Sequence, residues 1–130
     1  MPLRATITAA ALALAALAAA APAARAARAY VVESDFTTGS LSSVNATTKV
    51  PSCNGASVHS DARVRWYDGR VYVVNRIPAD NIQVLDGTTY ALVKQFSVGN
   101  GANPYDIAFA SPTRAYVTRY ESTDLWIVDP

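Results

Sequence analysis

Few side chains in this sequence are suited to holding a metal ion or to acid–base chemistry. Asp61 and Asp106 are the clearest candidates, since each stands near the start of an apolar segment, at matching places in two copies of a repeat. Oxygen atoms from two such carboxylates can hold a hard cation such as Ca²⁺. The alternative is that each aspartate caps a turn. Two carboxylates are a small ligand set, so the sequence favours the cap.

The only histidine, His59, and the only cysteine, Cys53, offer little more. A zinc site needs three or four nitrogen or sulfur ligands. Ser57, His59 and Asp61 have the residue types of a catalytic triad, but their spacing spreads them along one strand, too far apart to relay a proton. We expect His59 in an exposed loop and Cys53 as a half-buried, unreactive side chain. The sequence therefore predicts no catalytic residue and no cofactor.

Other polar and aromatic residues have expected structural or contact roles. Asn45, Asp86 and Asp129 each end one copy of a short apolar phrase, where such a side chain closes a turn by bonding the backbone two residues on. Most aromatic side chains are expected to fill interfaces between sheets, where they bury a large area. Trp66 and Tyr120 stand at the ends of predicted strands and are the candidates for exposed ligand contacts.

The elements that position these residues recur about forty residues apart. One phrase, of the type Arg-x-Tyr-Val-x, occupies residues 28–32, 70–74 and 114–118, and a second occupies 41–45, 82–86 and 125–129. Two phrases that recur in step indicate one supersecondary unit copied along the chain. The complete copy predicts four strands, over residues 61–66, 70–76, 81–86 and 90–98. The next copy predicts strands from Pro104 and over 114–120 and 124–129.

The pattern within the strands predicts how these sheets pack. The first copy lacks an opening strand, and its last strand, within residues 47–60, is interrupted by Pro51. Middle strands such as 71–74 are apolar at consecutive positions, which indicates that both faces of the sheet are covered. No helix is expected to cover them, so the cover must be other sheets. Four-stranded antiparallel sheets of about forty residues, stacked face to face, indicate an all-β fold of β-propeller blades.

The complete copy and the start of the next one contain five short motifs in a fixed order: Tyr72-Val73-Val74-Asn75, Ile82-Gln83-Val84-Leu85-Asp86, Thr88-Thr89, Ser97-Val98-Gly99 and Pro104-Tyr105-Asp106-Ile107-Ala108. Together they closely resemble the YVTN-type β-propeller repeat of bacterial and archaeal surface and periplasmic proteins. The resemblance implies a ring of typically seven blades and no defined catalytic site. It weakens across residues 49–62.

The domain organisation follows from the repeat. We expect a blade 1 remnant at 30–60, blade 2 at 61–103 and an incomplete blade 3 at 104–130, or about two and a quarter blades. A closed propeller needs about four to eight. The chain is therefore expected to be the front part of a longer propeller, with a truncated reading frame or a self-completing oligomer as alternatives. Alone, it is expected to be marginally stable and to associate through exposed blade faces.

Residues 1–29 are predicted to be a signal peptide. Arg4 precedes an apolar, alanine-rich run, and cleavage is expected before Ala27 or Tyr30. A membrane span is the alternative, but the run is short of the roughly 20 residues that a bilayer needs. No cysteine directly follows the run to serve as a lipid anchor, since Cys53 lies well beyond it. The expected location is therefore secreted, periplasmic or at the cell surface.

The net charge and the lack of predicted catalytic residues narrow the functions that the sequence suggests. Without residues 1–29 the chain has eight Lys and Arg against ten Asp and Glu, a net charge of −2, and no basic stripe for nucleic acid. We expect a binding or scaffold module of the cell envelope, with a protein, glycan or small-molecule ligand. The alternative is a lactonase-like or quinoprotein-like propeller enzyme whose active site lies in further blades. A third possibility is a non-functional truncated product.

Overall fold

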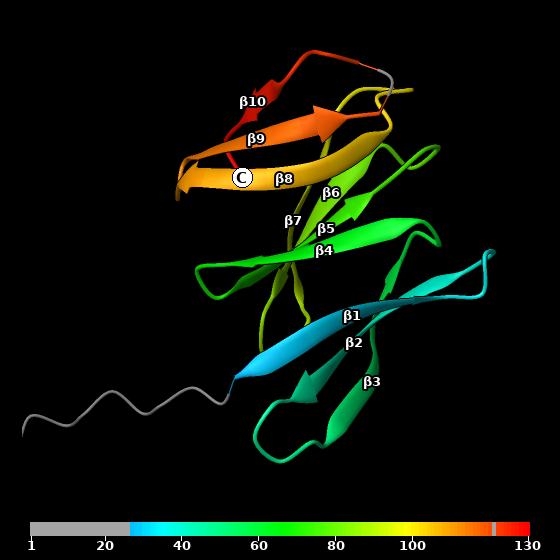
Figure 1. Cartoon of the computed structure of the whole chain (residues 1–130), viewed down its shortest axis with the longest axis vertical. Coiled ribbons are helices and arrows are strands. Elements are labelled where there is room, and N and C mark those ends of the chain that lie inside the picture. Colours follow the sequence, from blue (N-terminus) through cyan, green and yellow to red (C-terminus); the bar gives the residue numbers. More distant parts are fainter. Residues whose placement is uncertain (1–26, 121) are drawn as a thin grey trace, which may run out of the picture.

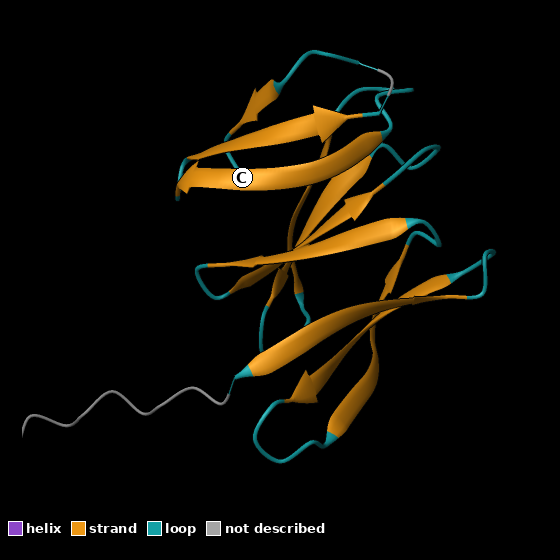
Figure 2. Cartoon of the chain, viewed as in Figure 1, coloured by secondary structure: helices purple, strands orange, loops and turns teal. Residues whose placement is uncertain are grey.

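The computed structural model describes residues 27–120 and 122–130, which form ten strands and no helix (Figure 2). The strands form three antiparallel sheets. The all-β fold expected from the sequence is therefore confirmed. The part of the chain that is described contains no helix able to cross a membrane. The predicted signal peptide lies outside the described residues, except for residues 27–29.

Each sheet follows the chain in order, strand beside strand. The first sheet contains β1 (Arg28–Ser34), β2 (Gly39–Asn45) and β3 (Pro51–Val58). The middle sheet contains β4 (Ala62–Tyr67), β5 (Arg70–Asn75), β6 (Asn81–Asp86) and β7 (Leu92–Ser97). The third sheet contains β8 (Pro104–Ser111), β9 (Arg114–Arg119) and β10 (Trp126–Val128). The strands of the middle sheet match the predicted ranges to within two residues.

The central strands of the middle sheet, β5 and β6, are buried on both faces, as their apolar residues predict. Successive side chains of a strand point to opposite faces. On β5, Val71 and Val73 pack toward the first sheet, where Leu41 and Val58 meet them. Tyr72 and Val74 pack toward the third sheet. Full burial of such a valine contributes about 1.5–3 kcal/mol, and Figure 1 shows the sheet lying between its two neighbours.

The first sheet differs from expectation at two places. β1 begins at Arg28, so its first two residues lie within the predicted signal peptide. Cys53 was expected to be half-buried, but it is exposed. The reason is that β3 is an edge strand whose first four residues, Pro51–Asn54, all lie in solvent, while the apolar contacts come later, from Ala56 and Val58. A proline at the first position of an edge strand removes no ladder bond that the sheet requires.

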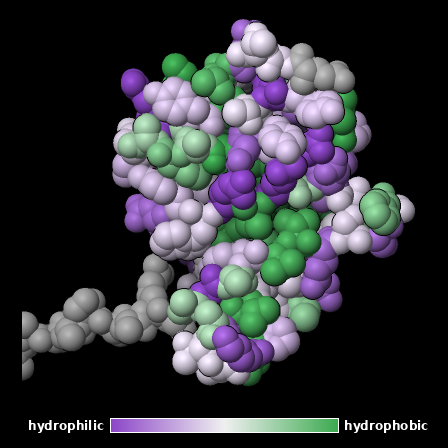
Figure 3. All heavy atoms as spheres, in the orientation of Figure 1, coloured by the Kyte–Doolittle hydropathy of each residue, from purple (hydrophilic) through white to green (hydrophobic). Residues whose placement is uncertain are grey.

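The two junctions between sheets differ in polarity. β1 lies against β4, and β4 lies against β8. In Figure 3, apolar side chains gather where the first and middle sheets adjoin, whereas hydrophilic side chains gather along the junction of the middle and third sheets. The two junctions therefore offer different chemistry to a ligand.

Candidate binding site

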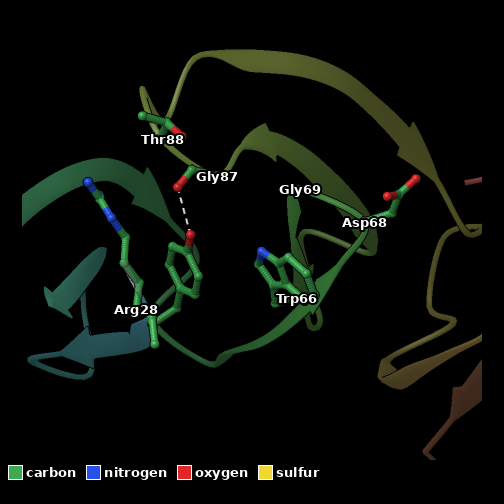
Figure 4. Close-up of a pocket in the computed structure, with 8 residues that line it drawn as sticks. Arg28, Trp66, Asp68, Gly69, Gly87 and Thr88 are labelled. Atoms are coloured by element: carbon green, nitrogen blue, oxygen red, sulfur yellow. Dashed lines mark hydrogen bonds between the residues drawn. The ribbon is translucent and has the colours of Figure 1, made fainter. Parts of the chain in front are cut away.

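A cavity of about 670 Å³ opens at the junction of the first and middle sheets (Figure 4). β1 contributes one wall, the end of β4 another, and the β4–β5 and β6–β7 turns the remainder. The lining residues are Ala27, Arg28, Tyr30, Trp66, Asp68, Gly69, Gly87 and Thr88. Its volume falls in the range of small-molecule pockets.

Hydrogen bonds hold the walls of this cavity together. The Tyr30 hydroxyl donates to the carbonyl of Gly87 (2.6 Å), which ties β1 to the β6–β7 turn. The Gly87 amide donates to the carbonyl of Gly69 (3.0 Å), which joins the two turns. A Cβ atom at Gly87 would lie 2.8 Å from the Gly69 oxygen, so this position requires glycine. The β4–β5 and β6–β7 turns therefore approach so closely at this wall of the cavity that no side chain fits at Gly87.

Trp66 provides the aromatic surface of the cavity. It pairs with Val71, so it lies on the face of the middle sheet that is turned toward the first sheet. It stands near the end of β4 and remains 57% exposed. Figure 4 shows the indole between the Arg28 side and the Asp68 turn. An exposed indole combines a flat apolar face with a polar N–H.

The turn after Trp66 brings an acidic residue, Asp68, to the edge of the cavity. Asp68 and Gly69 have φ values of 45° and 79°, the left-handed conformations that a two-residue hairpin turn of type I′ requires. The Asp-Gly pair therefore closes the hairpin and also places Asp68 among the lining residues. Arg28 supplies a positive group from β1. With one charge of each sign, the cavity suits a neutral polar ligand better than a strongly charged one.

Asp61 and Asp106 are not brought together as a cation site. Asp61 is paired with Arg76 (2.7 Å) and Asp106 with Arg65 (2.7 Å). No group of three or more His, Cys, Asp or Glu side chains suited to a metal occurs in the described ranges. Each carboxylate is instead neutralised by its own arginine.

The expected equivalence of these two aspartates is wrong. Asp106 pairs with Thr118 of β9, and the corresponding residue of β5, Val74, pairs with Arg63 rather than with Asp61. Asp106 therefore corresponds to Arg63, and a register shift between Pro104 and Asp106 adds one residue to β8 just before it. Asp61 lies before β4, where its backbone carbonyl accepts a bond from the Arg76 amide.

Two of the three predicted turn residues form the expected bonds. Asn45 Oδ1 accepts from the amides of Thr47 (2.9 Å) and Thr48 (3.0 Å). Asp86 Oδ1 accepts in the same way from Thr88 and Thr89, both at 3.0 Å. These amides, that of Thr89 first, lower the pKa of the Asp86 carboxyl below its usual 3.8.

Asp129 is engaged differently. Its backbone carbonyl accepts a bond from Lys94 Nζ (3.0 Å), which links the third sheet to β7. Within the described ranges its side chain forms no turn bond of the kind seen at Asn45 and Asp86. The next residue is Pro130, which has no N–H to donate.

His59 is half-buried between β3 and β4, not in an exposed loop as expected. Its Nδ1 accepts from the amide of Asp61 (3.1 Å), while the Asp61 carboxylate bonds Arg76, so no triad is assembled. The amide of His59 donates to Asn75 Oδ1 (2.9 Å). Asn75 is only 3% exposed and is the final residue of the Tyr-Val-Val-Asn motif. Its burial gives this residue a structural role that sequence reasoning left unassigned.

The aromatic side chains divide between interfaces and surface. Tyr67 stacks on Phe109 of the third sheet with ring centroids 4.4 Å apart, and Tyr72 is 5% exposed. Trp126 packs against the same core cluster. Tyr120 is 52% exposed and lies near the third sheet, away from the cavity that Trp66 lines. Of the two aromatic residues expected to be exposed, only Trp66 belongs to the cavity.

Comparison of the chain with protein-family models and with curated proteins gave no match in either case.

Proposed function

We propose that the three sheets are successive blades of a β-propeller of the YVTN type, and that the protein is an exported binding scaffold. The observation that carries this proposal is the middle sheet, whose two faces are both covered by neighbouring sheets of the same repeat. The contact of β4 with β8 adds support, because both open their copies and would line the central channel. A ring of about four to eight blades would be completed by a longer chain or by other copies of this chain.

The ligand we propose for the cavity is a sugar ring, within a glycan or alone. One face of a sugar ring consists of C–H groups, which fit the flat exposed side of Trp66. Hydroxyl groups at the rim of the sugar would donate to Asp68 and accept from Arg28. A pocket with an aromatic wall and a few polar groups is the usual design of such sites. A protein ligand through the same indole is the competing outcome of the test.

Tryptophan fluorescence tests this proposal because the chain has only two tryptophans. In a Trp126→Phe background, Trp66 becomes the sole reporter. Titration with a panel of mono- and oligosaccharides should change its emission saturably for at least one sugar. Trp66→Ala, assayed by calorimetry with that sugar, should weaken binding by at least about tenfold, as expected for loss of about 1.5–3 kcal/mol of apolar burial. Tyr120→Ala, a similarly exposed aromatic outside the cavity, should bind normally.

Two outcomes would count against this function. Failure of every sugar to alter Trp66 emission would remove the glycan assignment. Turnover of lactones or of a dye-linked substrate by the purified protein would overturn the non-enzymatic role.

Export is proposed with cleavage before Ala27. This position retains all of β1, since Arg28 pairs with Asn45 and the carbonyl of Ala27 accepts a bond from the Ala46 amide (2.7 Å). Cleavage before Tyr30 would delete two strand residues and two residues that line the cavity. N-terminal sequencing of protein recovered outside the cytoplasm of a bacterial host should therefore begin at Ala27. Recovery of the uncleaved chain only from the cytoplasm would contradict export.

A further inference from the structure

A second feature lies at the junction of the middle and third sheets and is independent of the propeller assignment. It is an arginine–tyrosine cluster formed by Arg63, Arg76, Tyr105 and Tyr120. Arg63 belongs to β4 and Tyr105 to β8, while Arg76 and Tyr120 directly follow β5 and β9. The cluster therefore draws one residue from each of four strands or strand ends.

The two guanidinium groups flank a pair of tyrosine rings. The Cζ atom of Arg63 lies 3.8 Å from the centroid of the Tyr105 ring. The Cζ atom of Arg76 lies 5.6 Å from the Tyr105 ring and 5.4 Å from the Tyr120 ring. The two rings are 6.3 Å apart and inclined by 30°. Cation–π contact orients each guanidinium but uses none of its N–H donors.

The hydrogen-bonding capacity of these arginines is largely unused. Within the described ranges the side chain of Arg63 has no ion-pair or hydrogen-bond partner, whereas that of Arg65, two residues further on the same strand, is paired with Asp106. Arg76 bonds Asp61 through Nη1, but its Nε is buried and has no partner in the part of the chain described. A buried donor without an acceptor costs about 1–3 kcal/mol.

The charge balance of the cluster favours an anion as that acceptor. Its two arginines face one carboxylate, that of Asp61, which is 60% exposed and therefore screened by water. The side chain of Arg76 is only 16% exposed, so its charge is less screened. Tyr105 and Tyr120 are 38% and 52% exposed, and their hydroxyls engage no partner in the described ranges. They can donate to the same ligand.

A purely structural role would not explain the unused hydrogen-bond donors of the arginine–tyrosine cluster. The same junction already has an ion pair between Arg65 and Asp106 and a ring stack between Tyr67 and Phe109. These two contacts satisfy their own groups, whereas the arginine–tyrosine cluster leaves donors open at an exposed surface. We propose that the cluster binds an anionic group, a carboxylate, sulfate or phosphate, with Arg63 and Arg76 as its main donors.

The test uses inorganic sulfate, inorganic phosphate and acetate as separate probes, at constant ionic strength set with sodium chloride. The Nε–H signal of Arg76 and the ring signals of Tyr105 and Tyr120 are followed by NMR. At least one probe should shift these signals saturably, and the strongest probe distinguishes a tetrahedral oxyanion from a carboxylate. Arg63→Gln should weaken binding at least about tenfold, since charge-assisted bonds are the strong ones.

Arg65→Gln is the matched control, because it lies on the same strand and face but outside the cluster. It should bind the probe as the unaltered protein does. Tyr120→Phe, which removes only a hydroxyl from an exposed ring, should weaken binding less than Arg63→Gln and tests the site without altering either arginine. Absence of a saturable shift with all three probes, or equal binding by Arg63→Gln, would overturn the proposal.

Discussion

Asp86 closes one turn and also joins two strands. One carboxylate oxygen accepts the amides of Thr88 and Thr89, and the other accepts from Arg70 Nη1 (2.9 Å). Asn45 makes the amide bonds at the matching place in the first sheet without a charge. The turn therefore requires a side-chain oxygen that accepts the two amides, whereas the negative charge of Asp86 adds an ion pair with Arg70.

The charge makes the stability of the protein depend on pH at this residue. The pKa of Asp86 is lower in the folded protein than its ordinary value of 3.8. Its contribution to the free energy of unfolding is therefore complete above pH 3.8 and is lost as the pH falls through the folded pKa. Urea midpoints measured from pH 6 down to about 2.5 should fall more steeply for the unaltered protein than for Asp86→Asn.

Asp86→Ala provides the matched comparison. It removes the acceptor as well as the charge, so it should lower the urea midpoint at every pH, whereas Asp86→Asn should retain much of the midpoint at neutral pH. Parallel pH curves for the unaltered protein and Asp86→Asn would show that the depressed pKa does not contribute to stability.

At the scale of elements, the loop between β7 and β8 is shaped by two glycines with positive φ. Gly99 has φ of 89° and Gly101 has φ of 71°. A Cβ atom at Gly99 would lie 2.7 Å from Cη2 of Trp126, whereas nothing lies within 4 Å of one at Gly101. Gly99 is thus constrained both by its backbone and by the packing of Trp126 on the third sheet.

The two glycines form a matched pair for mutation. Gly101→Ala should lower the free energy of unfolding by about 1 kcal/mol through backbone strain alone. Gly99→Ala should lower it by about 2–4 kcal/mol, since overpacking against Trp126 adds about 1–3 kcal/mol. Denaturant unfolding measures both, and the emission of Trp126 should change only for Gly99→Ala. Equal losses for the two variants would show that Trp126 moves aside without cost.

The elements were more predictable than the site, for physical reasons. Consecutive apolar residues in 71–74 and a turn pair at Asp68-Gly69 are local signals, so the strands of the middle sheet could be placed closely. The cavity depends on residues as distant in sequence as Arg28 and Gly87, and only Trp66 was identified in advance. The register shift near Asp106 and the edge position of Cys53 arise from strand pairing, which no single segment encodes.

At the scale of the whole molecule, the middle sheet couples two otherwise separate cores. The cluster toward the first sheet includes Val73, and the cluster toward the third sheet includes Val74; both side chains are fully buried. Adjacent residues of one strand therefore report on opposite interfaces. In a stack of repeats, stability is the sum of repeat terms and nearest-neighbour interface terms. Weakening the packing on one face of the middle sheet should therefore also weaken the packing on its other face.

Val73→Ala and Val74→Ala test this coupling. Each removes two methyl groups and leaves a cavity, so each should lower the free energy of unfolding by about 2–3 kcal/mol. If the three sheets unfold as one unit, amide hydrogen exchange should accelerate in β2 and β9 alike for both variants. Acceleration confined to β2 in Val73→Ala, and to β9 in Val74→Ala, would instead show that each interface opens independently and that the stack is not cooperative.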